Sequence, residues 1–171
     1  MKSGNKSVLL LLLFVLTNQA FAQIGIRFPS ERKVLKDPVT GAQLVFLTST
    51  ANGDQKIYQT HNQWTADGEW LIFRSKRVEG EAMAVHEKTG VMVQVTEGGY
   101  HGMLNIARKS MKLYFMRKPT GEDMSEGTLD LIEVDLARLF ADSKAGKLQP
   151  ESVYQRVCGS TPPEWQATGD M

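Results

Sequence analysis

The sequence predicts an all-β fold, a partial β-propeller made of two blade-like four-stranded antiparallel repeats and an N-terminal closing strand. Three observations support it. Short apolar runs alternate with polar turns over residues 60–99. Val91, Val93 and Val95 are separated by single residues, which is the period of a strand with two unlike faces. A second copy of the pattern follows, and a repeat of about 40 residues has the size of a propeller blade.

The first repeat is assigned to residues 57–99. Asp67-Gly68 forms a tight turn, because glycine tolerates a positive φ and aspartate can bond its own backbone. Strands are expected on both sides of this turn, at residues 63–66 and 70–73. A run at residues 82–85 and the alternation after Thr89-Gly90 supply two more. The sequence thus indicates a four-stranded meander, with Trp64, Trp70 and Phe73 in its core.

The second repeat is assigned to residues 100–158. Residues 104–115 align with the first repeat at a shift of about 42 residues, the length of one blade. Arg108-Lys109-Ser110 replaces the Asp-Gly turn, and Tyr114 and Phe115 are the expected core residues. Residues 129–135 and 154–157 would be the third and fourth strands. Residues 159–171 are a tail or the truncated start of a third blade.

The first 22 residues read as a secretory signal peptide. Lys2 and Lys6 precede an apolar run at residues 8–16, and Ala20-Phe21-Ala22 is a small-x-small cleavage site. The apolar run is short for a membrane span. We therefore expect cleavage before Gln23, a periplasmic or secreted location, and no membrane attachment afterwards.

Residues 23–56 are interpreted as an N-terminal extension with the closing strand. Residues 23–36 read as coil, and residues 37–41 as a turn. Residues 42–48 are similar to the fourth strand of a blade. Such a strand completes the last blade of a propeller and so removes an exposed sheet edge. The closing blade is missing here, and we expect the chain to be the front part of a longer protein.

Charge and cysteine content exclude two classes of function. Without Lys2 and Lys6 the chain has 18 basic and 19 acidic residues, which gives no support to nucleic-acid binding. Cys158 is the single cysteine, so it cannot form an intramolecular disulfide. We expect it to be a small buried apolar residue.

The repeat motif resembles the TolB-type propeller repeat, in the segments WTADGEWLIFRS, TG and QVT. With the leading DPVTG segment and Leu47-Thr48, the chain resembles the N-terminal part of oligogalacturonate lyases, which are seven-bladed propellers. The resemblance implies β-elimination on pectin-derived oligogalacturonides, with an acidic oligosaccharide as the partner. It also implies a divalent metal ion, which in this family is Mn²⁺. The family's metal ligands and catalytic base lie in later blades. His61, His86 and His101 are isolated here, so neither metal ligands nor catalytic residues are assigned.

The chemistry suggests where substrate would be held. β-Elimination removes the C5 proton of a uronate, and a metal or arginine must neutralise the adjacent carboxylate. In blade geometry the second-to-third strand loops and the between-blade loops surround the top of the channel. A cationic rim there suits a polyanionic sugar. The substrate-binding candidates are His61, Arg74, Arg77, His101 and Arg117, with Lys76 and Lys118 in the same loops.

Other interpretations stay open. Charged loops are usually only solvated, and a histidine beside an inner strand is usually structural; His86 is expected to be solvated at a bottom turn. The chain could be the front of a lyase that lacks the catalytic centre. It could instead be a non-catalytic TolB-like propeller that binds a protein or carbohydrate partner. A truncated product without independent function is the third alternative.

Overall fold

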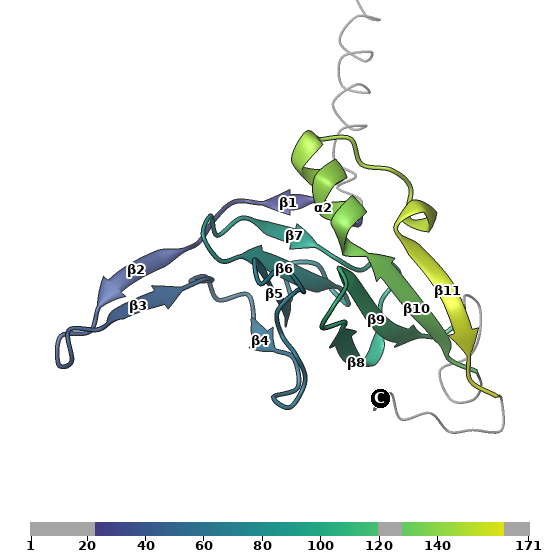
Figure 1. Cartoon of the computed structure of the whole chain (residues 1–171), viewed down its shortest axis with the longest axis horizontal. Coiled ribbons are helices and arrows are strands. Elements are labelled where there is room, and N and C mark those ends of the chain that lie inside the picture. The colour runs from purple at the N-terminus through teal and green to yellow at the C-terminus, as the bar shows by residue number, and fades with distance from the viewer. Residues whose placement is uncertain (1–22, 120–127, 163–171) are drawn as a thin grey trace, which may run out of the picture.

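The computed structural model describes residues 23–119 and 128–162, and its two larger sheets, both antiparallel, lie side by side (Figure 1). The first sheet has the order β1-β7-β6-β5-β4. Its strands are β1 (Arg27–Phe28), β4 (Gln55–Lys56), β5 (Trp70–Arg74), β6 (Ala82–His86) and β7 (Met92–Gln94). Three of them, β5, β6 and β7, match three of the four strands of the expected meander.

The inner edge of the first sheet is divided into two short stretches. β4 pairs with the end of β5, where Lys56 faces Phe73. A single bridge joins Trp64 to Leu71 nearer the start of β5. The predicted strand at residues 63–66 is therefore reduced to a single bridge at Trp64, and β4 takes the remaining part of this edge.

The second sheet has the order β11-β10-β9-β8 and matches the second repeat. Its strands are β8 (His101–Ile106), β9 (Lys112–Arg117), β10 (Asp130–Asp135) and β11 (Gln155–Ser160). A bulge in β8 lies between His101 and Leu104. The sequence located all four strands to within a few residues.

A helix that the sequence analysis did not expect connects β10 to β11. Helix α2 (Leu136–Ala145) begins after Asp135, whose carboxylate accepts a hydrogen bond from the Arg138 backbone N–H. It ends at Gly146, which has the left-handed conformation typical of a helix C-cap. A short 3₁₀ turn, η1 (Glu151–Val153), follows it.

The N-terminal segment differs from its prediction. Residues 23–36 are not only coil, since β1 adds to the outer edge of the first sheet beside β7. β2 (Lys33–Lys36) and β3 (Gln43–Phe46) form a separate antiparallel hairpin that extends away from both sheets (Figure 1). The expected closing strand is thus one arm of this hairpin, and its exposed apolar side chains include Val34, Leu35, Leu44, Val45 and Phe46.

The main core lies between the two sheets and beneath α2. Ile72 and Ala84 of the first sheet belong to one buried cluster with Leu104, Ile106 and Phe115 of the second. Helix α2 contributes to the same cluster, and the Phe140 ring stacks on Trp70 with centroids 4.1 Å apart. Face-to-face burial of this kind is how neighbouring sheets of a propeller-like fold are held together.

The expected burial of Cys158 was wrong, whereas the expected core aromatics are buried fully or in part. Cys158 is exposed rather than buried, because it lies on the outermost strand of the second sheet. Trp70, Phe73 and Phe115 are buried as expected, whereas Trp64 and Tyr114 are half-buried. Within the described residues, no helix is long and apolar enough to cross a membrane. The proposed signal peptide and most of the tail at residues 159–171 lie outside those residues.

Candidate functional site

Arg74 joins β5 of the first sheet to β8 of the second. It ends β5, and its Nη2 donates a hydrogen bond of 2.9 Å to the Gly102 carbonyl in the bulge of β8. The guanidinium carbon lies 5.9 Å from the centre of the Tyr100 ring, at cation–π distance. Nε is buried without a hydrogen-bond partner. Across residues 23–119 and 128–162, no carboxylate forms an ion pair with Arg74, so its charge is available to an anion.

His101 is the first residue of β8 and directly precedes Gly102, whose carbonyl accepts the hydrogen bond from Arg74. It is half-buried and pairs across the ladder with Met116. The structure therefore places two of the five sequence-derived candidates, Arg74 and His101, at the same junction. Tyr100 completes this group and was missed by the sequence analysis, although its position directly after Gly98-Gly99 marks it as the residue that follows the connection between the repeats.

The connection between the two repeats, residues 97–100, is fixed by the buried carboxylate of Glu81. Glu81 accepts hydrogen bonds from the Thr96 hydroxyl at 2.6 Å and from the Gly99 backbone N–H at 2.9 Å. Its side chain lies in the interior, and this burial raises the pKa of Glu81. Glu81 was also missed by the sequence analysis, because it appears only as one charge in a polar loop. It fixes the connection from the side of the first sheet.

Arg117 holds the same connection from the second sheet. Its Nη1 donates to the Glu97 carbonyl at 2.7 Å and pairs with the Glu151 carboxylate at 2.7 Å. Gln155 adds a hydrogen bond from its side-chain amide to the Glu97 carbonyl. The Arg117 charge is therefore already paired, and its contacts give this candidate a positioning role.

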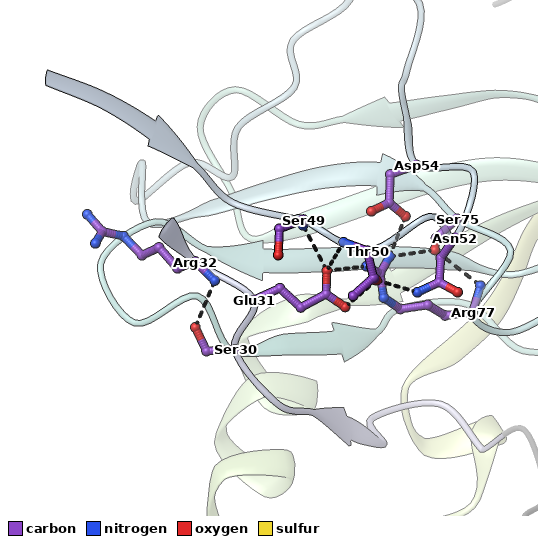
Figure 2. Close-up of polar contacts among 9 residues, drawn as sticks. All are labelled: Ser30, Glu31, Arg32, Ser49, Thr50, Asn52, Asp54, Ser75 and Arg77. Carbon is purple, nitrogen blue, oxygen red and sulfur yellow. Dashed lines mark hydrogen bonds and ion pairs between the residues drawn. The ribbon is translucent and has the colours of Figure 1, made fainter. Parts of the chain in front are cut away.

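Arg77 is the centre of a polar cluster that attaches the N-terminal segment to the first sheet (Figure 2). Its guanidinium pairs with Glu31 at 2.8 Å and with Asp54, and it donates to the Ser75 hydroxyl at 2.8 Å. The Arg77 side chain is only 5% exposed. Like Arg117, it is therefore occupied by partners within the chain.

Hydrogen bonds around Glu31 stabilise its ionised form. Burial opposes ionisation, but the Ser49 backbone N–H, Arg77 and Thr50 together lower the pKa of Glu31 to about 2. The carboxylate is thus charged at neutral pH and matches the fixed charge of Arg77.

His61 lies in a different place from Arg74. It lines an open cavity of about 560 Å³ with neighbours from the loop before Trp64, the Asp67-Gly68 turn and Arg108 of the second repeat. Its ring meets Tyr58 edge-on at 5.6 Å. The two histidines proposed at the channel, His61 and His101, therefore do not share this cavity.

His86 is not the solvated histidine that the sequence predicted. Its side chain is 18% exposed and its ring packs edge-on against Trp70, with centroids 4.9 Å apart. Its Nδ1 accepts a hydrogen bond from the Lys88 backbone N–H at 3.2 Å. Lys76, by contrast, is exposed.

The residues that the structure describes do not form a divalent metal centre. Metal sites of the kind expected here need three or more clustered His, Cys, Asp or Glu ligands. The described part of the chain contains no such group.

The arrangement of two antiparallel sheets packed through an inter-sheet core defines a propeller-like all-β fold. Comparison with solved structures agrees. The chain is similar to an oligogalacturonate lyase in complex with manganese, with 22% identity, a TM-score of 0.58 and alignment over 84% of this chain. It is also similar to the oligogalacturonate lyase of Vibrio parahaemolyticus, with 19% identity, a TM-score of 0.56 and alignment over 80% of this chain.

These similarities establish a shared fold. The chain spans 33% and 30% of the lengths of the two lyase structures. No protein-family model matches the sequence, and no curated protein matches it.

Proposed function

We propose that this chain is the N-terminal part of an oligogalacturonate lyase and contributes to binding its acidic oligosaccharide. Arg74 carries the proposal, because its guanidinium lacks a carboxylate partner within the described residues and lies against Tyr100 where β5 contacts β8. The shared fold with two such lyases supports the substrate class.

The roles of the candidate residues follow from their contacts. Arg74 would pair with a uronate carboxylate, since guanidinium and carboxylate match in geometry and charge. His101, beside the Gly102 carbonyl that Arg74 holds, would contact the same sugar. Arg77 and Arg117 would act as positioning residues, because their ion pairs hold the segments around the site.

The elimination step itself is not assigned to the described residues. One of the similar lyases is a manganese complex, and a divalent cation would neutralise the carboxylate beside the C5 proton. The described residues do not fit such an ion. In this proposal the metal and the base belong to blades beyond the two in this chain, and the 171 residues alone are inactive.

The hairpin fits a role in ring closure. Val34, Leu35, Leu44, Val45 and Phe46 are 40–54% exposed. An apolar groove lies beside this hairpin, over Leu71, Phe73 and Val85 of the first sheet. We propose that a closing blade covers both surfaces. Export through the signal peptide would place the protein in the periplasm or outside the cell.

Titration calorimetry with trigalacturonate tests the binding proposal, and neutral galactotriose is the matched ligand control. We expect binding of the acidic sugar alone. Arg74→Gln should weaken it about tenfold, as expected for loss of one charge-assisted hydrogen bond. Arg138→Gln, at an arginine on α2 that is 57% exposed, should leave the affinity unchanged.

Equal binding to the Arg74→Gln variant, or no binding of trigalacturonate, would contradict the proposal. The second candidate function is a non-catalytic propeller that binds a partner. Capture of a defined partner by a chain that binds no acidic sugar would support that function instead.

A further inference from the structure

The cavity that contains His61 is the feature of the molecule that the proposed site does not use. Its walls come from both repeats and are mostly polar, and they carry imidazole, amide, hydroxyl, carboxylate and guanidinium groups. The lining side chains that could bind a ligand are those of Thr60, His61, Asn62, Thr65, Asp67 and Arg108. Such a mixture of donors and acceptors suits a polyhydroxylated ligand better than an apolar one.

Arg108 supplies the positive charge of this cavity. It lies in the turn after β8, where the second repeat has Arg-Lys-Ser in place of the Asp-Gly of the first. The side chain is exposed, and no hydrogen bond or ion pair joins it to another described residue. The Arg108 guanidinium of the second repeat and the Asp67-Gly68 turn of the first repeat thus line the same cavity.

His61 is a second polar residue of this cavity. Its Nδ1 is buried and has no hydrogen-bond partner among the described residues. Buried polar atoms are nearly always paired, so no hydrogen bond to Nδ1 within the described residues fixes the orientation of this ring. The residue lines the same cavity as Arg108.

The carboxylate of Asp67 restricts the class of ligand. One of its oxygens accepts hydrogen bonds from the Thr65 hydroxyl at 2.5 Å and from the Glu69 backbone N–H at 3.0 Å. The negative charge remains in the wall, and it disfavours a compact dianion such as phosphate. A ligand with one carboxylate for Arg108 and hydroxyl donors for Asp67 satisfies both walls.

We propose that this cavity is a second sugar-acid subsite, in which Arg108 binds the carboxylate of a uronate and Asp67 and His61 bind its hydroxyl groups. The identity of the ligand as a uronate rests on the proposed function. The subsite is separate from Arg74, which does not line this cavity. An acidic oligosaccharide could then contact the chain at two places.

Histidine NMR tests this subsite directly. The chain has three histidines, so the ring signal of His61 can be assigned with a His61→Gln variant. Monomeric galacturonate is the probe, and galactose is its neutral control. We expect galacturonate to shift the His61 signal saturably, and Arg108→Gln to weaken this binding about tenfold. Lys109→Gln changes the neighbouring exposed cation, which does not line the cavity, and should behave like the unchanged chain.

The outcomes separate this proposal from the one about Arg74. A His61 signal that does not move at saturating galacturonate, or that moves equally in the Arg108→Gln chain, would overturn the subsite while leaving the Arg74 result intact. Saturable binding that depends on Arg108 would support it, even if trigalacturonate affinity proved insensitive to Arg74→Gln.

Discussion

Nη2 of Arg77 lies 2.8 Å from Oε2 of Glu31, so one ion pair connects the N-terminal segment to the loop after β5 across 46 residues of sequence. Both side chains are largely withdrawn from solvent, at 5% and 14% exposure. The same Glu31 carboxylate accepts hydrogen bonds from the Ser49 and Thr50 backbone N–H groups, which follow the hairpin (Figure 2). Glu31 therefore holds the base of the hairpin against the first sheet.

Glu31→Gln should destabilise the chain by about 1–3 kcal/mol, because it leaves part of the buried Arg77 charge unpaired while Asp54 still contacts it. Urea unfolding measures the change, and hydrogen exchange should show faster opening at Ser49 and Thr50. Glu79→Gln removes an exposed carboxylate from the loop before β6 and is the matched control. Equal stability of the two variants would show that the ion pair does not hold the hairpin.

Acid should destabilise the fold over a defined range of pH. The pKa of Glu31 is lowered to about 2, and Arg156, Tyr114 and Lys112 lower the pKa of Glu133 to about 2 against the opposing effect of burial. Both carboxylates have an ordinary pKa of 4.5, so their stabilising contribution is present above that pH and is lost as the pH falls towards 2.

Unfolding free energies measured between pH 7 and pH 2 test this dependence. Glu81 has a raised pKa and contributes with the opposite sign, so the informative comparison is with a Glu31→Gln/Glu133→Gln chain. That chain should show a shallower loss of stability below pH 4.5. Parallel curves for the two chains would contradict the assigned shifts.

Gly90 tests how closely the N-terminal segment crosses the first sheet. A Cβ at this position would lie 2.2 Å from the Ser30 hydroxyl and 2.5 Å from the Arg32 Cβ. Gly68 has a similar positive φ, but open space surrounds its Cβ position. Gly68→Ala should cost about 1 kcal/mol from backbone strain alone, and Gly90→Ala should cost about 1–3 kcal/mol more. Thermal unfolding of both variants checks this, and equal losses would place the segment elsewhere.

Phe140 tests whether α2 belongs to the core between the sheets. Its ring is 7% exposed and stacks on Trp70 at an interplanar angle of 15°. Phe140→Ala should cost about 3–5 kcal/mol and alter tryptophan fluorescence, because the cavity opens beside Trp70. Arg138→Ala, at the exposed position on the same helix, should change stability by less than about 0.5 kcal/mol. A loss of stability well below about 3 kcal/mol for Phe140→Ala would mean that α2 does not pack into the core between the sheets.

The strands were predictable where local signals agree. The Asp67-Gly68 and Thr89-Gly90 turns and the alternation of valines located β5, β6 and β7, and the repeat length transferred the pattern to the second sheet. Helix α2 was missed even though it carries its own signals. Asp135 is its N-cap, Gly146 its C-cap, and Leu136, Leu139, Phe140 and Ser143 form its buried face at helical spacing.

The site was less predictable than the fold, because its residues are distant in sequence. In the sequence, Arg74 and Arg77 look equivalent, because both belong to one charged segment at the end of β5. One faces Tyr100 without an acidic partner among the described residues, and the other is enclosed by Glu31 and Asp54. Residues 23–36 were read as coil because β1 is only two residues long and β2 is exposed throughout, so neither shows half-buried alternation.

The packing of the two sheets through a shared core under α2 is tested most directly by nuclear Overhauser contacts in a chain that starts at Gln23. The account predicts contacts between the Trp70 indole and the Phe140 ring, together with contacts from Ile72 to residues of β8 such as Leu104. Protected β-sheet amides in both repeats without any contact between the sheets, or helical signals over residues 63–96, would contradict it.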